Sequence, residues 1–138
     1  MQFEYKIKGG DFSEAGTISS KLKKILKQLN IDNKIIKKVV IALYEAEVNV
    51  IAHAYNGKVN IDIDTEKIEI NIKDKGPGIE NIAKAMEKGF STATSKVREM
   101  GFGAGMGLPN IKKNSDKLDI KSKVSEGTNL KIITFLNK

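Results

Sequence analysis

The sequence predicts a single α+β domain, a two-layer sandwich with a mainly antiparallel, mixed sheet and helices on one face. Three observations predict this fold class: short segments alternate apolar with polar residues, longer segments repeat apolar residues at helical spacing, and tight turns join two of the four successive pairs of strand segments. Strands joined by tight turns pair antiparallel. The 138 residues are the usual size of one domain, which we expect to span positions 1–138.

The first half of the chain contains two predicted helices. Asp11 and Glu14 are spaced as in a capping box, which predicts that the first helix begins there. The second helix carries apolar residues between positions 35 and 54, and Asn56-Gly57 predicts the turn that ends it. Both helices have the apolar stripe that a helix packed on a sheet requires.

The remaining elements follow in a simple order of hairpin, short helix, loop, helix and hairpin. Strands are predicted at residues 3–7, 59–63, 68–72, 118–124 and 129–136, and further helices at 80–87 and after position 107. Pro109 suits the first turn of the last helix. Residues 88–100 follow no sustained period and have the composition of a mobile loop or lid.

The composition excludes several classes of site. There is no Cys and only one His, His53, so disulfides, thiolate or multi-histidine metal sites and Cys nucleophiles are excluded. The net charge of +7 comes almost entirely from Lys, with Arg98 the sole Arg, and aromatic residues do not interleave with the basic ones. This pattern favours a solvated surface over nucleic-acid binding. No stretch is long and apolar enough to span a membrane, so we expect a soluble, cytoplasmic protein.

Glycine occupies alternate positions in a loop that leads into a predicted helix, at Gly101, Gly103, Gly105 and Gly107. Such a backbone can bring N–H groups close to an anion, and the helix start adds its dipole, so a phosphate cradle is predicted. Met106 and Leu108 stand where a dinucleotide-binding motif would need Gly, and no Gly-Lys-Ser/Thr triplet occurs. The alternative is a flexible loop without a ligand.

Glu45 and Asn49 lie four residues apart on the second predicted helix and therefore project from the same face. A carboxylate there can accept the proton of a hydroxyl, and an amide oxygen can coordinate Mg²⁺. His53 continues this stripe, whereas Glu47 points elsewhere. Taken singly, each residue also fits a solvated or structural role.

Asp74 ends an apolar strand directly before Gly76-Pro77-Gly78. Its carboxylate can accept a hydrogen bond from an exocyclic amine such as that of adenine, and the glycines allow a ligand to approach closely. An Asp that merely initiates a turn is the alternative.

Taken together, these segments resemble one family. Residues 45–49 resemble the N box, 74–78 the G1 box and 103–108 the G2 box of the GHKL (Bergerat-fold) ATP-binding domains, and Gly127-Thr128 resembles the final Gly-Thr motif. Within that superfamily the chain is similar to the anti-sigma-factor serine/threonine kinases of bacterial partner switching. The anti-sigma and switch-kinase branches of that group both stay open.

The resemblance implies a role for each matched residue. Glu45 would be the catalytic base, Asn49 the Mg²⁺ ligand, and Asp74 the residue that reads adenine. Thr128 would support the adenine site through water. Arg98 would contact transferring phosphate or a partner, with a solvated side chain as the alternative. The implied nucleotide-binding residues are completed by Gly76, Gly78, Ile79, Gly101, Gly103, Gly105, Met106, Gly107 and Leu108.

The resemblance also implies a function: a Mg-ATP-dependent serine/threonine protein kinase that phosphorylates a STAS-type anti-sigma antagonist. A sigma factor is the expected second partner and a homodimer the expected assembly, with no direct binding of nucleic acid or membrane. The alternative is a module in which ATP changes partner affinity without phosphorylation, although a pure binder has no need for Glu45. A histidine kinase is disfavoured, because His53 lies by the N box and no separate phosphoacceptor helix is predicted.

Overall fold

The computed structural model describes residues 1–79, 81–86 and 107–136. Several sequence predictions therefore lie outside the described residues: the lid at 88–100, Arg98, and four members of the glycine-rich loop, Gly101, Gly103, Gly105 and Met106. Of that loop, Gly107 and Leu108 are described.

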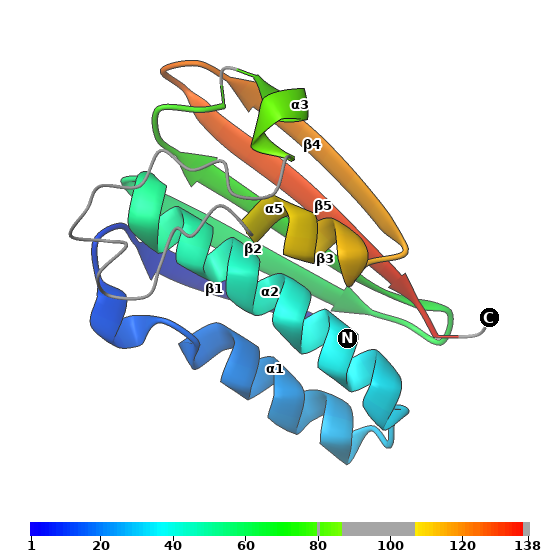
Figure 1. Cartoon of the computed structure of the whole chain (residues 1–138). Coiled ribbons are helices and arrows are strands. Elements are labelled where there is room, and N and C mark those ends of the chain that lie inside the picture. Colours follow the sequence, from blue (N-terminus) through cyan, green and yellow to red (C-terminus); the bar gives the residue numbers. More distant parts are fainter. Residues whose placement is uncertain (80, 87–106, 137–138) are drawn as a thin grey trace.

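The described residues form one five-stranded sheet in the order β1-β2-β3-β5-β4. All four strand pairings are antiparallel. The strands are β1 (Gln2–Lys8), β2 (Asn56–Ile63), β3 (Lys67–Lys75), β4 (Lys117–Lys123) and β5 (Gly127–Phe135). Helices cover one face of this sheet (Figure 1). The predicted two-layer α+β fold is confirmed.

The helical layer is built around α2 (Asn33–His53), which contacts both α1 (Thr17–Gln28) and α5 (Gly107–Lys113). A 3-10 turn, η1 (Phe12–Glu14), precedes α1, and a single helical turn, α3 (Ile82–Ala85), lies within the predicted 80–87 helix. No described helix is both long and apolar enough to cross a membrane.

The core lies between the helical layer and the inner face of the sheet. Strand β2 alternates exposed and buried residues along its whole length, as the sequence pattern predicts. Its buried Ile61 stands opposite the buried Ile70 of β3, which in turn stands opposite the buried Ile132 of β5. Val39 and Leu43 of α2 are fully buried against this layer. The spacing of apolar residues thus determines which face of each strand and helix packs into the core.

The first helix begins later than the predicted capping box at Asp11 and Glu14. Its N-cap is Gly16, at a φ of 90° that favours glycine, and α1 proper starts at Thr17. Asp11 accepts a hydrogen bond from the Ser13 hydroxyl instead of capping a helix. The capping-box prediction is therefore wrong, because local side-chain bonds and η1 occupy this segment.

Glu47 of α2 caps α1 from across the helical layer. Its Oε2 accepts the backbone N–H groups of Gly16 (3.1 Å) and Ile18 (3.2 Å), and its Oε1 accepts that of Ser19 (3.3 Å). The side chain is 1% exposed. Three of the backbone donors that a helix start leaves unpaired are thus satisfied by one carboxylate.

The predicted turn at Asn56-Gly57 is also wrong. Helix α2 ends at His53, and Asn56 and Gly57 are the first residues of β2, where Gly57 stands opposite Asp74. A Cβ at position 57 would lie 2.7 Å from Cγ1 of Val50. Glycine is needed here because α2 packs tightly on the strand, not because the chain turns.

Candidate functional site

The predicted polar stripe of α2 faces the start of α5. The amide of Asn110 donates a hydrogen bond from Nδ2 to Oε1 of Glu45 at 3.4 Å. One turn further along α2, Asn49 lies against Gly107, the first residue of α5. The helix pair thus holds the predicted catalytic base and the predicted Mg²⁺ ligand beside the end of the glycine-rich loop.

Gly107 fits its place only because it has no side chain. A Cβ there would lie 2.8 Å from Oδ1 and 3.0 Å from Nδ2 of Asn49. The backbone at the start of α5 therefore comes directly against the Asn49 amide. An amide oxygen at this point can ligate a hard cation that also contacts phosphate oxygens.

A Mg²⁺ site of this kind does not require a cluster of protein carboxylates, since Mg²⁺ keeps several waters and binds substrate phosphates. Among the described residues no group of three His, Cys, Asp or Glu side chains could hold a metal ion. Asn49 is accordingly the described residue whose chemistry fits a Mg²⁺ bound together with a nucleotide.

Glu45 is half-buried between α2 and α5. Burial raises the pKa of its carboxyl group above the usual value, and the hydrogen bond from Asn110 opposes that rise. A carboxylate with a raised pKa is a stronger base than a solvated one. The environment of Glu45 suits proton acceptance from a hydroxyl.

The second part of the site is built where β3 ends and β5 begins. The backbone N–H of Thr128 donates to Oδ1 of Asp74 at 3.1 Å. A Cβ on the neighbouring Gly127 would collide with the Asp74 carbonyl, so glycine allows the two strands to meet. Burial raises the pKa of Asp74, and the Thr128 N–H opposes the rise. In the described part of the chain, Oδ2 of Asp74 accepts no hydrogen bond.

Ser122 of β4 joins this part of the site to the loop at residues 76–79. Its Oγ accepts the Ile79 N–H at 2.7 Å and lies 2.8 Å from Oγ1 of Thr128 and 3.1 Å from the Gly127 carbonyl. The Gly127 carbonyl can only accept, so it takes the single Ser122 proton, and the Thr128 hydroxyl then donates to Ser122. Thr128 is left with acceptor lone pairs.

Asp74 and Thr128 therefore present hydrogen-bond acceptors. The free Oδ2 of Asp74 and the lone pairs of Thr128 Oγ1 match an exocyclic amine, which carries two donors. A carbonyl at the same place would find no donor. This polarity fits adenine better than guanine.

The loop at residues 76–79 is held from two sides. Gly76 packs against the end of α2, where a Cβ would lie 2.9 Å from Cα of Ala54. The Pro77 carbonyl accepts the Ser125 N–H at 2.8 Å, which ties the loop to the β4–β5 turn. The loop therefore connects Asp74 to the helix that carries Glu45 and Asn49.

The described residues bring the predicted elements of the site together around the C-terminal half of α2. Glu45, Asn49, Gly107 and Leu108 lie at the α2–α5 contact, and Asp74, Gly76, Gly78, Ile79 and Thr128 lie between β3, β4 and β5. Leu108 is buried in the core. His53, at the end of the stripe, has its pKa lowered by burial.

Sequence reasoning missed two residues that organise these groups. A single Asn in a helix does not mark Asn110 as a site residue, and a single Ser in an alternating strand does not mark Ser122 as one. Neither role could be predicted from the local sequence. The hydrogen bond between Asn110 and Glu45 joins residues 65 positions apart, and that between Ser122 and Ile79 joins residues 43 positions apart.

Sequence comparison identifies relatives for most of the chain. Residues 11–134 match the family model of the histidine kinase-like ATPase domain. The chain is 32% identical over 103 residues to the serine/threonine-protein kinase RsbT of Bacillus subtilis (strain 168), covering 72% of this chain and 71% of that protein. It is 33% identical over 102 residues to an anti-sigma F factor of Caldanaerobacter subterraneus subsp. tengcongensis, covering 70% of this chain and 68% of the relative.

Solved structures share the fold at low sequence identity. The RsbU and RsbW domains of Rv1364c from Mycobacterium tuberculosis match with a TM-score of 0.66 and 14% identity, over 97% of this chain and 32% of that longer one. This chain thus spans about a third of that protein. The mycobacterial sensor histidine kinase MprB matches with a TM-score of 0.56 and 17% identity, over 98% of this chain and 97% of that one. These likenesses show the fold alone.

Proposed function

The chain belongs to the histidine kinase-like ATPase domain family, and from this premise we propose that it is an ATP-binding serine/threonine protein kinase of the partner-switching type. The relatives carry the names serine/threonine-protein kinase and anti-sigma F factor. The observation that carries the proposal here is the pairing of Glu45 and Asn49 on one face of α2, against the start of α5. The proposal takes Glu45 as the proton acceptor and Asn49, one helical turn away, as the cation ligand.

In the proposed reaction, Glu45 accepts the proton of a serine or threonine hydroxyl on a partner protein as that oxygen attacks the γ-phosphorus. Asn110 holds the Glu45 carboxylate through the 3.4 Å hydrogen bond. Phosphoryl transfer depends mainly on positioning and charge neutralisation, so one base and a backbone cradle meet its needs. Mg²⁺, when bound, supplies neutralisation of the phosphate charge, with Asn49 as its protein ligand.

Asp74 and Thr128 hold the adenine through the acceptors described above. The loop at residues 76–79 would line the base, and Gly107 would contact the phosphates. The sequence assigns the same role to Gly101, Gly103 and Gly105, which lie outside the described residues. The predicted substrate is a STAS-type anti-sigma antagonist, and a sigma factor is the second partner. The protein works in the cytoplasm, where such partners occur.

Phosphorylation separates this proposal from an ATP-gated binding module. The purified protein is incubated with a co-encoded STAS-type protein and either ATP or a non-hydrolysable ATP analogue, and the partner is analysed by mass spectrometry. A kinase gives phosphoserine or phosphothreonine on the partner with ATP only. Complex formation with both nucleotides and no modification of the partner would overturn the kinase proposal in favour of the binding module.

A further inference from the structure

The face of the sheet that the helices leave open carries a row of lysines. Strand register places Lys6 of β1 opposite Lys58 of β2, and Lys58 opposite Lys73 of β3. The row continues through Asn129 of β5 to Lys121 of β4. All these residues are exposed. Since neighbouring strands are about 4.8 Å apart, this lysine row extends over roughly 19 Å of the open face.

Positive charge is concentrated at one end of this face. Next to the lysine row, towards the loop at residues 76–79, stand Lys8, Lys75 and Lys123, also exposed. Lys73 and Lys75 flank Asp74 on β3, but alternation turns them to the open face while Asp74 faces the helical layer. The lysine row thus lies behind the strand that carries Asp74.

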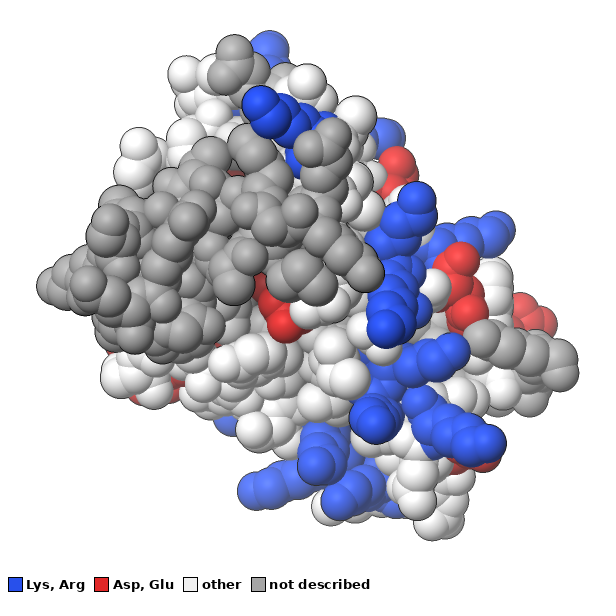
Figure 2. Space-filling view, in the orientation of Figure 1, with Lys and Arg blue, Asp and Glu red and all other residues white. Residues whose placement is uncertain are grey.

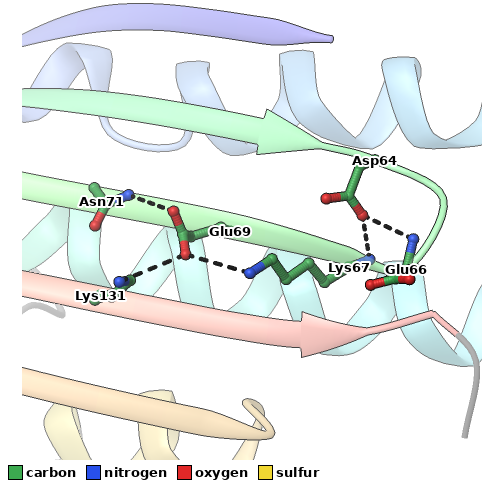
Figure 3. Close-up of polar contacts among 6 residues, drawn as sticks. All are labelled: Asp64, Glu66, Lys67, Glu69, Asn71 and Lys131. Atoms are coloured by element: carbon green, nitrogen blue, oxygen red, sulfur yellow. Dashed lines mark hydrogen bonds and ion pairs between the residues drawn. The ribbon is translucent and has the colours of Figure 1, made fainter.

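Within the described strands, the acidic residues of the open face lie in the other rows, while Glu126 of the β4–β5 turn forms an ion pair with Lys123 at 3.4 Å. Glu4 and Asp119 share the next row, and Asp62 and Glu69 the one after it. Figure 3 shows this half, where Glu69 lies 3.7 Å from Lys131 and 3.9 Å from Lys67. The charge of Glu69 is thus compensated within the molecule.

The lysine row holds two successive like-charged pairs, Lys6–Lys58 and Lys58–Lys73, directly opposite each other across neighbouring strands. Such pairs destabilise a sheet. The like-charged pair Asp62–Glu69 differs, because Glu69 contacts two lysines. Within the described residues only Lys58 of the row forms an ion pair, with Glu4 at 3.0 Å. The repulsion between Lys58 and Lys73 on one side, and between Lys58 and Lys6 on the other, is a cost that an external anionic surface would relieve.

We propose that the lysine row is a docking surface for an acidic face of a second protein. The row contains neither Arg nor an aromatic side chain. Proteins that recognise nucleic acids rely on bidentate Arg contacts to bases and on aromatic side chains that stack on bases. The exposed lysines provide charge complementary to an acidic partner surface, and the interface that they would form has no apolar core. Such a surface speeds association and sets partner choice, and it releases the partner readily. The surface lies on the opposite side of the sheet from Glu45, so it does not depend on kinase activity.

The helical layer is also rich in lysine, as the blue band in Figure 2 shows, and it provides the matched control. The test set reverses three charges of the lysine row: Lys6→Glu, Lys73→Glu and Lys121→Glu. The control set makes the same change in net charge on α1 and α2: Lys23→Glu, Lys34→Glu and Lys37→Glu. All six residues are exposed. Binding is measured by fluorescence anisotropy of labelled poly-L-glutamate at low and physiological salt.

The test set should weaken binding of poly-L-glutamate by about tenfold or more at low salt, while the control set weakens it less than about threefold. The single change Lys73→Glu should raise the melting temperature, because it converts a repulsive cross-strand pair into an attractive one. If a lysine-row variant binds poly-L-glutamate more weakly but melts at a higher temperature, misfolding cannot explain the weaker binding.

Three outcomes would overturn the proposal. Equal losses in the test and control sets would mean that net charge alone attracts the probe. Tighter binding of poly-uridylate RNA than of poly-L-glutamate, lost in the test set, would assign the surface to nucleic acid. Lysine-row-dependent binding of phosphatidylglycerol vesicles in preference to poly-L-glutamate would assign it to a membrane. Each readout is independent of ATP binding and phosphoryl transfer, which are measured separately.

Discussion

The backbone N–H of Thr128 donates to Oδ1 of Asp74 at 3.1 Å, across the junction of β3 and β5. This bond uses one carboxylate oxygen and leaves the other as an acceptor for a ligand. In the proposed adenine site, the other oxygen of Asp74 would accept a hydrogen bond from the base, so one residue would serve both the sheet and the nucleotide.

Replacing Asp74 by Asn should weaken ATP binding by roughly 10- to 100-fold, the effect of losing one hydrogen bond to a charged group. Asn can still accept the Thr128 N–H, but its second position becomes an NH₂ donor that faces the donors of the adenine amine. Isothermal titration calorimetry measures the loss. Asp119→Asn, an exposed change on β4, is the control and should leave ATP affinity unchanged.

Removing the Ser122 hydroxyl should both destabilise the fold and weaken ATP binding. Ser122→Ala leaves the Ile79 N–H without its 2.7 Å acceptor, at a cost of about 1–3 kcal/mol in the free energy of unfolding. It also releases the Thr128 hydroxyl to turn its proton towards the base, so discrimination between ATP and GTP should fall. Urea denaturation and nucleotide titrations check both effects. Ser20→Ala, exposed on α1, should change neither.

Replacing Asn110 by Ala should shift the pH dependence of phosphoryl transfer. Burial holds the pKa of Glu45 above its usual value, and the Asn110 amide partly offsets this by stabilising the charged form. Without the amide the pKa of Glu45 rises further, so the acidic limb of the kcat profile moves to higher pH while ATP affinity stays the same. An unshifted limb would show that Asn110 does not act on the base. Lys113→Ala, exposed on the same helix, is the control.

The two candidate caps of α1 can be separated by stability measurements. Glu47→Ala should lower the free energy of unfolding by about 2–4 kcal/mol, because three backbone N–H groups lose their acceptor. Glu14→Ala should cost less than about 0.5 kcal/mol, since the Glu14 carboxylate is exposed and accepts a hydrogen bond only from the Thr17 hydroxyl among the described residues. Equal costs would contradict the assignment of Glu47 as the cap.

The strands, the order of the elements and the Glu45–Asn49 pair were predictable because they depend on local periodicity. Alternation in β2 and β3 reports burial on one face, and a separation of four residues places two side chains on one face of any helix. Such signals need no knowledge of what lies across the core.

The sequence predictions that were wrong or missing concern residues whose roles depend on contacts with distant parts of the chain. The Asp11–Glu14 spacing has the pattern of a capping box, but the carboxylate that caps α1 comes from Glu47, 28 to 31 residues away. Asn56-Gly57 has the pattern of a turn, but Gly57 is needed for its contact with Val50. The roles of Asn110 and Ser122 likewise arise only when distant elements meet. Tertiary contacts override local patterns at these positions.

The most direct test of the account is the rate of phosphoryl transfer from γ-labelled ATP to a co-encoded STAS-type partner by the Glu45→Gln variant, measured at saturating ATP. Gln keeps the size of the side chain and can keep a hydrogen bond with Asn110, but it cannot accept a proton. The account predicts a rate lowered by about 100-fold or more with ATP affinity within about threefold of the unmodified protein. Transfer at an unchanged rate would contradict the assignment of Glu45 as the base.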